Sequence, residues 1–221
     1  MPPEPDPVPS KADYILEAAR RLFARYGFRR TAMEDIAREA GVAKGTVYLY
    51  FDSKDAVYLA VQARDAAEVL ARCDRAAAAH GGFRDRLHAM LDAKFGLFFE
   101  RYGASEHAAE LKALNRTLGR EAARTLDEAY ARRLTDLIEA AARAGEIDLA
   151  ASALTSESVV RMAVAGAVGL KYCAEAGADA RAYRAKLGEL ATLIAAAVRG
   201  RGAAARRGGA AAPPPPRPPR S

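Results

Sequence analysis

The sequence predicts an all-α fold in which a small N-terminal helical domain precedes a larger helical domain. Apolar residues recur three or four positions apart through most of the chain, and no convincing alternation of a half-buried strand is present. Glycines stand where this helical pattern breaks, for example at Gly27, Gly41 and Gly145. With 221 residues, about half of them hydrophobic, the chain is long enough to bury a proper core.

The two ends of the sequence differ in composition from the helical region. The leader, residues 1–10, is rich in proline and acidic, and residues 200–221 form a tail of alanine, proline and arginine. Segments of this kind cannot bury enough apolar area to fold, so we expect both to be disordered. The leader has no basic residue ahead of an apolar stretch, which excludes a secretory signal.

The net charge of +6 does not by itself indicate a nucleic-acid ligand. The chain has 34 basic and 28 acidic residues, and six arginines from Arg199 onward account for the whole excess. The remainder is neutral. An argument for DNA binding therefore has to rest on where particular residues lie.

The first helix has a clear start and a clear end. Ser10 followed by Asp13 predicts a helix N-cap, and Gly27 predicts the stop. Between them the apolar residues share one face, as in a helix that packs on a core. These residues are Ile15, Ala19, Leu22, Phe23 and Tyr26.

A second and a third helix follow at short intervals. Thr31 and Glu34 have the spacing of a capping box, so a second helix is expected to begin there and to end at Gly41. A short third helix is expected over residues 43–50. Two short helices joined by a tight glycine turn form a helix-turn-helix, whose second helix can enter the major groove of DNA.

The third helix combines an anchoring face with a face that suits DNA. Val47 and Phe51 are four residues apart and can pack together on the protein. The opposite side offers a hydroxyl for base edges, tyrosine rings, a lysine for phosphates and a glycine for close backbone approach. Singly, each residue also fits an ordinary structural role; their combination is what favours DNA. The residues of this side are Lys44, Gly45, Thr46 and Tyr48, with Leu49 and Tyr50 at its edges.

The stretch LFARYGFRRTAMEDIAREAGVAKGTVYLYFDSKDAVYLA resembles the N-terminal signature of the TetR family of bacterial transcriptional regulators. The resemblance implies a helix-turn-helix DNA-binding domain over residues 11–56 and a helical effector-binding and dimerisation domain over residues 57–199. It also implies a ligand-responsive repressor in the cytoplasm that binds an inverted-repeat operator as a homodimer. Met33 departs mildly from the family pattern, because a thioether cannot donate a hydrogen bond to a phosphate. The DNA contacts that the resemblance implies are Thr31, Met33, Lys44, Thr46, Tyr48, Tyr50 and Lys54.

The rest of the chain continues as helices. Ser53 can cap a long helix that runs to about Ala79, and Gly145 followed by Ile147 fits a left-handed helix stop with its hydrophobic contact. The two cysteines, Cys73 and Cys173, are too few for a disulfide framework, which suits a reducing cytoplasm. No apolar run is long enough to span a bilayer. The further helices are expected at roughly residues 83–101, 106–118, 120–144, 155–176 and 180–199.

The last two helices are candidates for a dimer interface. Their small residues allow close helix approach and their apolar residues repeat at helical spacing. The resemblance implies that they pair with the same helices of a second copy in a four-helix bundle. A buried stripe within the chain's own core explains the same residues equally well. The candidate interface residues are Ala163, Gly166, Ala167, Leu187, Leu190, Ile194 and Val198.

The larger domain also contains aromatic residues that could line an effector pocket, although an aromatic stripe on a helix is more often plain core. His107 and Glu110 are three residues apart, but two ligands without further His or Cys favour a hydrogen-bonded pair over a metal site. We therefore expect no metal and no cofactor. The candidate pocket residues are Phe95, Phe98, Phe99, Tyr102, His107, Tyr130, Met162 and Tyr172.

Two other functional classes remain as alternatives. An enzyme is disfavoured, because the sequence has no nucleophile elbow, phosphate-binding glycine loop or cluster of metal ligands. A non-specific architectural DNA-binding protein, aided by the arginines of the tail, is the main alternative. The partners expected for a regulator are double-stranded DNA, a small-molecule effector and a second copy of the chain.

Overall fold

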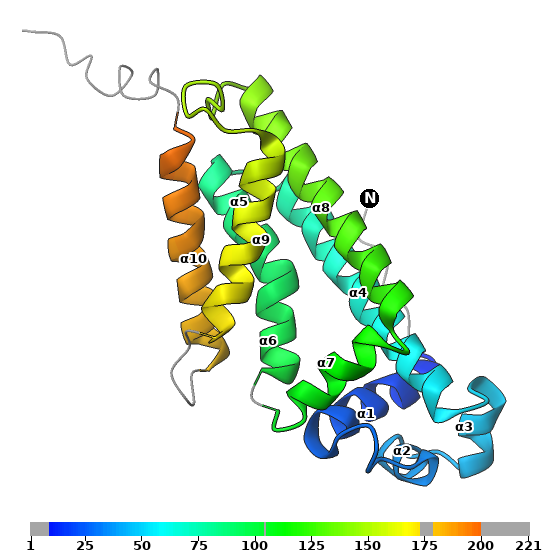
Figure 1. Ribbon diagram of the computed structural model, residues 1–221. Coiled ribbons are helices and arrows are strands. Elements are labelled where there is room, and N and C mark those ends of the chain that lie inside the picture. Colours follow the sequence, from blue (N-terminus) through cyan, green and yellow to red (C-terminus); the bar gives the residue numbers. More distant parts are fainter. Residues whose placement is uncertain (1–8, 104, 173–178, 200–221) are drawn as a thin grey trace, which may run out of the picture.

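Two helical bundles share the long helix α4 (Figure 1). The computed structural model describes residues 9–103, 105–172 and 179–199, and every regular element among them is helical, as the sequence predicts. Helices α1 to α3 and the start of α4 form the smaller bundle, and α7 lies across the junction against α1. In chain order the elements are α1 (Lys11–Tyr26), α2 (Met33–Glu39), α3 (Lys44–Tyr50), α4 (Lys54–Ala78), α5 (Phe83–Leu91), the π-helical turn η1 (Asp92–Gly96), α6 (Leu97–Tyr102), α7 (Ala108–Arg116), α8 (Arg120–Arg143), α9 (Ser156–Tyr172) and α10 (Ala180–Ala197).

Local signals set the ends of α1 and the start of α4. The Ser10 hydroxyl accepts a hydrogen bond from the Asp13 amide at 3.2 Å, and the Asp13 carboxylate accepts one from the Ser10 amide at 2.8 Å. Gly27 ends α1 with a φ of 82°, a conformation that favours glycine. The Ser53 hydroxyl accepts from the Ala56 amide at 3.1 Å. These contacts confirm the helix ends predicted from Ser10, Gly27 and Ser53.

The prediction that a capping box at Thr31 opens the second helix is wrong. Helix α2 begins at Met33, and the Asp35 carboxylate accepts a hydrogen bond from the Ala32 amide at 3.0 Å. The Thr31 hydroxyl instead donates to the carbonyl oxygen of Gly27 at 2.7 Å, within the preceding turn. The pattern favours Thr31, because a capping box needs a hydroxyl at its first position, but that hydroxyl is bonded to Gly27, and Ala32 takes the cap position without a side-chain hydrogen bond.

The single helix expected over residues 83–101 is interrupted by the π-helical turn η1. Asp92 at the start of this turn accepts a hydrogen bond from Arg184 of α10 at 2.7 Å. The Asp92 carboxylate lies so close to Gly96 that a side chain there would overlap it. A contact with a distant helix thus accompanies the widened turn, and helical periodicity does not reveal it.

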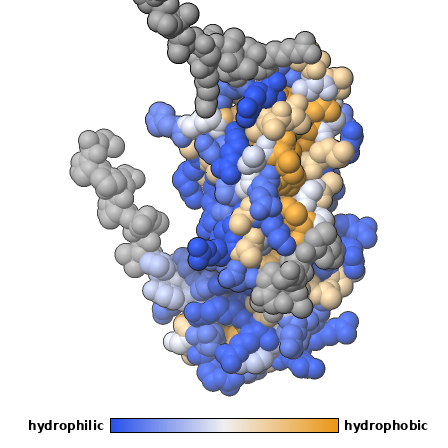
Figure 2. Space-filling view, turned by 90° about the vertical axis from the view of Figure 1, so that its left-hand side faces the viewer, coloured by the Kyte–Doolittle hydropathy of each residue, from blue (hydrophilic) through white to orange (hydrophobic). Residues whose placement is uncertain are grey.

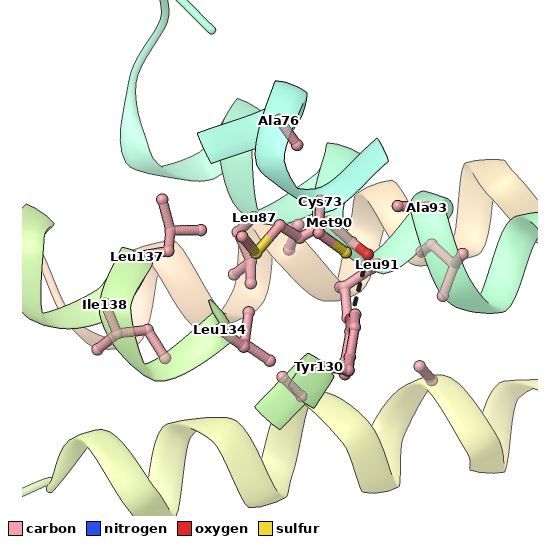
Figure 3. Close-up of a cluster of buried hydrophobic side chains, with 14 of the residues drawn as sticks. Cys73, Ala76, Leu87, Met90, Leu91, Ala93, Tyr130, Leu134, Leu137 and Ile138 are labelled. Carbon is pink, nitrogen blue, oxygen red and sulfur yellow. Dashed lines mark hydrogen bonds between the residues drawn. The ribbon is translucent and has the colours of Figure 1, made fainter. Parts of the chain in front are cut away.

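The core of the larger bundle lies between α4, α5, α8, α9 and α10, and Figure 3 shows its centre. Tyr130 is buried there, and its hydroxyl donates to the carbonyl oxygen of Met90 at 3.1 Å (Figure 3). Cys73 is also buried, and burial raises the pKa of its thiol to about 11, so the side chain acts as a small apolar group. Around them pack Leu87, Leu91, Leu134, Leu137 and Ile138.

A second core joins the smaller bundle to α7. The ring centres of Phe23, Phe28 and Tyr58 are 5.4–5.9 Å apart. Leu111 of α7 packs in the same cluster. The Glu110 carboxylate of α7 accepts a hydrogen bond from the Arg29 amide at 2.9 Å. The loop that follows α1 is therefore attached directly to the larger domain.

Some expectations fall on residues that the structure does not describe. These are the predicted disorder of residues 200–221 and of residues 1–8 of the leader, the end of the helix expected over residues 155–176, and the position of Cys173. The last residue of the expected leader, Ser10, is ordered as the cap of α1. Across residues 9–103, 105–172 and 179–199, no helix has the length and apolar character needed to cross a membrane.

Candidate nucleic-acid interface and ligand cavity

The turn between α2 and α3 is tight and depends on a glycine. Gly41 has a φ of 68°, and the Val42 amide donates to the carbonyl oxygen of Ala37 at 3.0 Å. No atom lies within 4 Å of where a Gly41 side chain would begin, so the backbone conformation, rather than space, requires glycine there. This turn sets the angle between α2 and α3.

Helix α3 is held by one fully buried side chain. Val47 has no exposed surface and packs in the core of the smaller bundle, with the half-buried Phe51 beside it. Leu49 is 84% exposed, and the neighbouring Tyr48 and Tyr50 are also exposed. A helix that buries one residue and exposes large apolar and aromatic side chains presents a binding surface.

Lys44 is exposed but not unpaired in this structure. Its ammonium group forms an ion pair with Glu34 of α2 and lies 5.8 Å from the centre of the Tyr48 ring. The hydrogen bond from Lys44 lowers the pKa of the Glu34 carboxyl, and the same bond raises the pKa of Lys44. Since exposed ion pairs are weak, a phosphate can compete with Glu34 for this ammonium group.

A phosphate contact would require the Lys54 side chain to extend into solvent, but it does not. Its ammonium group donates to the carbonyl oxygens of Phe28 and Thr31, each at 2.8 Å, and lies 4.4 Å from the centre of the Phe28 ring. A third carbonyl, that of Arg29, lies 3.4 Å away. The expected DNA contact is therefore revised: this lysine fixes the loop between α1 and α2 onto the start of α4.

The structure also revises the expectations for Thr31 and Met33. Thr31 is 3% exposed and Met33 is 6% exposed, so both side chains belong to the core of the smaller bundle. The Thr31 hydroxyl is already bonded to Gly27. Neither side chain presents a group to DNA in this conformation, whereas Gly45 is exposed and Thr46 half-buried on α3.

Sequence reasoning missed two basic residues beside α2. Arg29 and Arg30 are exposed, and neither guanidinium forms an ion pair with a described residue. Arg30 lines a surface groove of about 380 Å³ together with Thr31, Asp35 and Arg38. The adjacent arginines in the printed sequence were the available signal, but they precede the predicted helix rather than lying on it.

A short, exposed helix behind a tight turn, carried by a larger helical bundle, defines the class of helix-turn-helix DNA-binding proteins. Residues 15–61 match the family described as bacterial regulatory proteins, tetR family. The match confirms the TetR resemblance for the N-terminal helix-turn-helix region, which is the part of the chain that the matched residues cover.

Individual relatives show how far the likeness extends. YfiR of Bacillus subtilis, an uncharacterized HTH-type transcriptional regulator, is 40% identical over 63 residues, which are 28% of this chain and 31% of YfiR. The chain matches less than a third of the length of the curated relatives.

Solved structures share the fold over a greater length. FadR of Bacillus halodurans, a fatty acid degradation regulator, has a TM-score of 0.65 at 19% identity, covering 89% of this chain and 100% of that one. FadR of Bacillus subtilis, solved in complex with stearoyl-CoA, has a TM-score of 0.62 at 19% identity, with coverages of 84% and 98%. At this level of identity the likeness shows the fold alone.

The residues expected to line an effector pocket separate in the structure. Phe98 and Tyr102 line a cavity of about 190 Å³ between α1, α4, α6 and α7, whereas Met162 is exposed. The side chain of Tyr172 lies outside the described part of the chain. The others contact neighbouring residues. Phe95 packs edge-on against Tyr130 and Phe99 stacks on Tyr183, with ring centres 5.8 Å and 4.3 Å apart. Nδ1 of His107 lies 3.7 Å from Oε2 of Glu110.

A buried polar cluster adjoins the same cavity. Asp65 of α4 is 2% exposed, and its carboxylate accepts hydrogen bonds from the Tyr102 hydroxyl at 2.6 Å and from Arg101. Burial raises the pKa of Asp65, while these two contacts oppose that shift. The cluster links α6 to the middle of α4.

None of the predicted dimer residues is exposed, and three of them, Gly166, Leu190 and Ile194, are half-buried. Ala163, Ala167, Leu187 and Val198 are fully buried within the chain, so their side chains serve its own core. A side chain at Gly166 would meet Leu190 within 3 Å, which shows that Gly166 allows α9 and α10 of one chain to pack closely.

The surface of α9 and α10 carries other apolar residues. Met162 is 64% exposed, Leu193 is 69% exposed and Val168 is 43% exposed. Figure 2 shows hydrophobic side chains gathered in a band along this side of the larger bundle, flanked by hydrophilic ones. We name the surface formed by Met162, Val168 and Leu193 the α9–α10 face.

Proposed function

We propose that this chain is a sequence-specific transcriptional repressor that reads an operator through α3. The observation that carries the proposal is the construction of α3, in which Val47 is buried while chemically varied side chains face solvent. Thr46 and the two tyrosines suit base edges and thymine methyl groups, and Lys44 suits phosphate. The proposed contact residues are Lys44, Gly45, Thr46, Tyr48 and Tyr50.

We further propose that two copies bind an inverted repeat. A single seven-residue helix contacts few base pairs, and two-fold symmetric helix-turn-helix dimers place their reading helices about one helical turn of DNA apart. The α9–α10 face supports this proposal, because exposed apolar side chains on two neighbouring helices are typical of an association surface. The domain division at residues 56 and 57 is part of the same proposal.

A ligand would act by changing the separation of the two reading helices. If the larger domain binds a ligand more tightly when the helices are too far apart for the operator, the ligand shifts the population away from DNA. The coupling in such systems is typically about 1–3 kcal/mol. Helix α4 suits the role of lever, because it belongs to both cores. The proposal places the protein in the cytoplasm and requires no catalysis.

The test is enrichment of random DNA fragments by the full chain at physiological salt. We expect an inverted repeat to be enriched by the unmodified protein and lost in the double variant Thr46→Ala/Tyr48→Ala. Tyr14→Ala is the matched control, because Tyr14 is also an exposed tyrosine but lies on α1. The carbonyl oxygen of the preceding residue, Asp13, accepts a hydrogen bond from Arg64, which lies well along α4 from α3. This control should keep the enrichment.

The alternative, non-specific architectural binding, gives a different result in the same experiment. Sequence-blind recovery of DNA by both the unmodified protein and the double variant would contradict operator reading by α3. Removal of residues 200–221 separates the two further: operator recognition should survive, because the proposed contacts lie on α3. Complete loss of DNA binding on this truncation would favour the architectural alternative.

A further inference from the structure

The cavity beside Tyr102 has a wall of mixed chemistry. Most of its surface is apolar and comes from aromatic and aliphatic side chains, and its polar groups include two amides, two lysines and the hydroxyls of two tyrosines. At about 190 Å³ it is smaller than the roughly 300–1,000 Å³ of sites for drug-sized ligands. Among the lining residues are Phe23, Tyr58, Gln62, Phe98, Asn115 and Lys171.

The two amides keep hydrogen-bonding capacity that the described protein does not use. The side chain of Gln62 is half-buried and forms no hydrogen bond with a described residue. The Asn115 carbonyl accepts from the Tyr58 hydroxyl at 2.6 Å, which fixes the amide and leaves its NH₂ group without a described partner. Half-buried amides in a mainly apolar wall are groups that a ligand can satisfy.

The two amides also line a neighbouring cavity. Gln62, Phe98 and Asn115 also line a second cavity of about 140 Å³, which extends toward Lys94 and Asp127. Lys94 and Asp127 are bonded to each other at 2.6 Å, so they close the far end as a neutral pair. Both amides therefore lie where the two cavities meet.

The wall of the first cavity includes a positively charged group, the Lys171 ammonium. The described residues that line it include Lys171 and also Lys112, which is engaged in an interaction of its own, and none of these described residues is acidic. The Lys171 ammonium group forms no ion pair with a described residue. The nearby Asp65 carboxylate is not among the lining residues, and it is already engaged by Arg101 and by the Tyr102 hydroxyl. The wall thus favours an anion.

We propose that this cavity binds a small monocarboxylate with a compact apolar body. The body contacts Phe23, Tyr58 and Phe98, and the carboxylate is held by Lys171 and by the amides of Gln62 and Asn115. The inference deepens the proposed function, on which it rests for the ligand's regulatory role. It also makes the DNA-binding domain part of the ligand site, because Phe23 and Tyr58 belong to the core that anchors α3.

The test is calorimetric titration of the full chain, without DNA, against three acids and their primary amides. The acids are benzoate, phenylacetate and hexanoate, which differ in the shape of the apolar body but share the carboxylate. We expect at least one acid to bind about tenfold or more tightly than its own amide. Lys171→Gln removes the positive charge, and it should reduce the preference for the acid over its amide about fivefold while leaving the affinity for the amide unchanged.

Two further variants and one large ligand sharpen the result. Gln62→Leu should weaken both members of the pair, whereas Lys11→Gln, which removes an exposed lysine outside the cavity, should change neither. Equal affinity for acid and amide, or no binding of any acid at millimolar concentration, would overturn the proposal. So would tight binding of stearoyl-CoA that is lost in Gln62→Leu while the acids fail to bind.

Operator binding is measured in parallel with the same proteins, which separates the two proposals. Acid binding without recognition of an operator would leave the ligand site standing and contradict the proposed function. Operator recognition with no acid bound would do the reverse. If an acid binds and operator affinity does not change, the site is a monocarboxylate site and the proposed switch fails.

Discussion

Helices α3 and α8 use the same residue types in opposite environments. The 24-residue α8 buries Tyr130, and the tyrosine hydroxyl is bonded to the carbonyl oxygen of Met90. Burial raises the pKa of Tyr130 well above its usual value, so this hydroxyl stays protonated and donates. The seven-residue α3 exposes Tyr48 and Tyr50, whose hydroxyls donate to no described residue. A tyrosine with a partner inside the protein stabilises the fold, whereas an exposed one is available to DNA.

The largest difference between the two helices should appear when leucine is replaced by alanine in each. Leu134 of α8 is fully buried, and Leu134→Ala should lower the free energy of unfolding by about 2–5 kcal/mol. Leu49 of α3 is 84% exposed, and Leu49→Ala should change it by less than about 0.5 kcal/mol. Urea unfolding at one fixed protein concentration measures both, since association makes stability depend on concentration.

The two substitutions should also differ in their effect on DNA. Leu49→Ala should weaken binding to the enriched operator, because Leu49 projects from the reading helix. Leu134→Ala should leave operator affinity unchanged wherever the protein remains folded. Equal destabilisation by the two variants would show that α3 is packed as core, contrary to the comparison.

Sequence patterns predicted the parts of the fold that local contacts determine. The caps at Ser10 and Ser53 and the glycine stops at Gly27 and Gly145 depend on residues within one turn, so the sequence shows them directly. The π-helical turn at Asp92 depends on Arg184, which is far away in the sequence. No pattern within residues 83–101 contains that partner.

The candidate sites divide in the same way. The position of α3 follows from the spacing of Val47 and Gly41, and the sequence was sufficient to find it. The sequence could not show that the Lys54 ammonium group donates to backbone carbonyls, because those carbonyls belong to a loop more than 20 residues earlier. The cavity was predicted only in part. Phe98 and Tyr102 were expected to line a pocket, whereas Phe23, Gln62 and Asn115 come from three helices that only the tertiary structure brings together.

A smaller effect should distinguish the two lysines that the TetR resemblance places at DNA. Lys54→Met should lower the free energy of unfolding by about 1–3 kcal/mol, because it leaves part-buried carbonyls of the α1–α2 loop without their donor. Lys44→Met removes only an exposed pair with Glu34 and should leave unfolding unchanged.

Salt dependence of operator binding provides the complementary measurement. Lys44→Met should reduce the slope of the logarithm of affinity against the logarithm of salt concentration by about 1, as expected for one lost phosphate contact. Lys54→Met should weaken binding without that change in slope, because its ammonium group positions the loop. An unchanged slope for Lys44→Met would remove Lys44 from the proposed contacts.

The smallest effects should come from replacing two glycines, Gly41 and Gly45, by alanine. The two substitutions should change the free energy of unfolding in opposite directions. Gly41→Ala places a side chain at a φ of 68° and should cost about 1–2 kcal/mol of unfolding free energy. Gly45→Ala replaces a glycine within α3 where no atom lies within 4 Å, so it should gain up to about 1 kcal/mol. Both should weaken operator binding, the first through the angle of α3 and the second through lost backbone approach to phosphate. If Gly45→Ala stabilises the protein and binds the operator as tightly as the unmodified chain, Gly45 serves no contact, and the reading surface is limited to the side chains of α3.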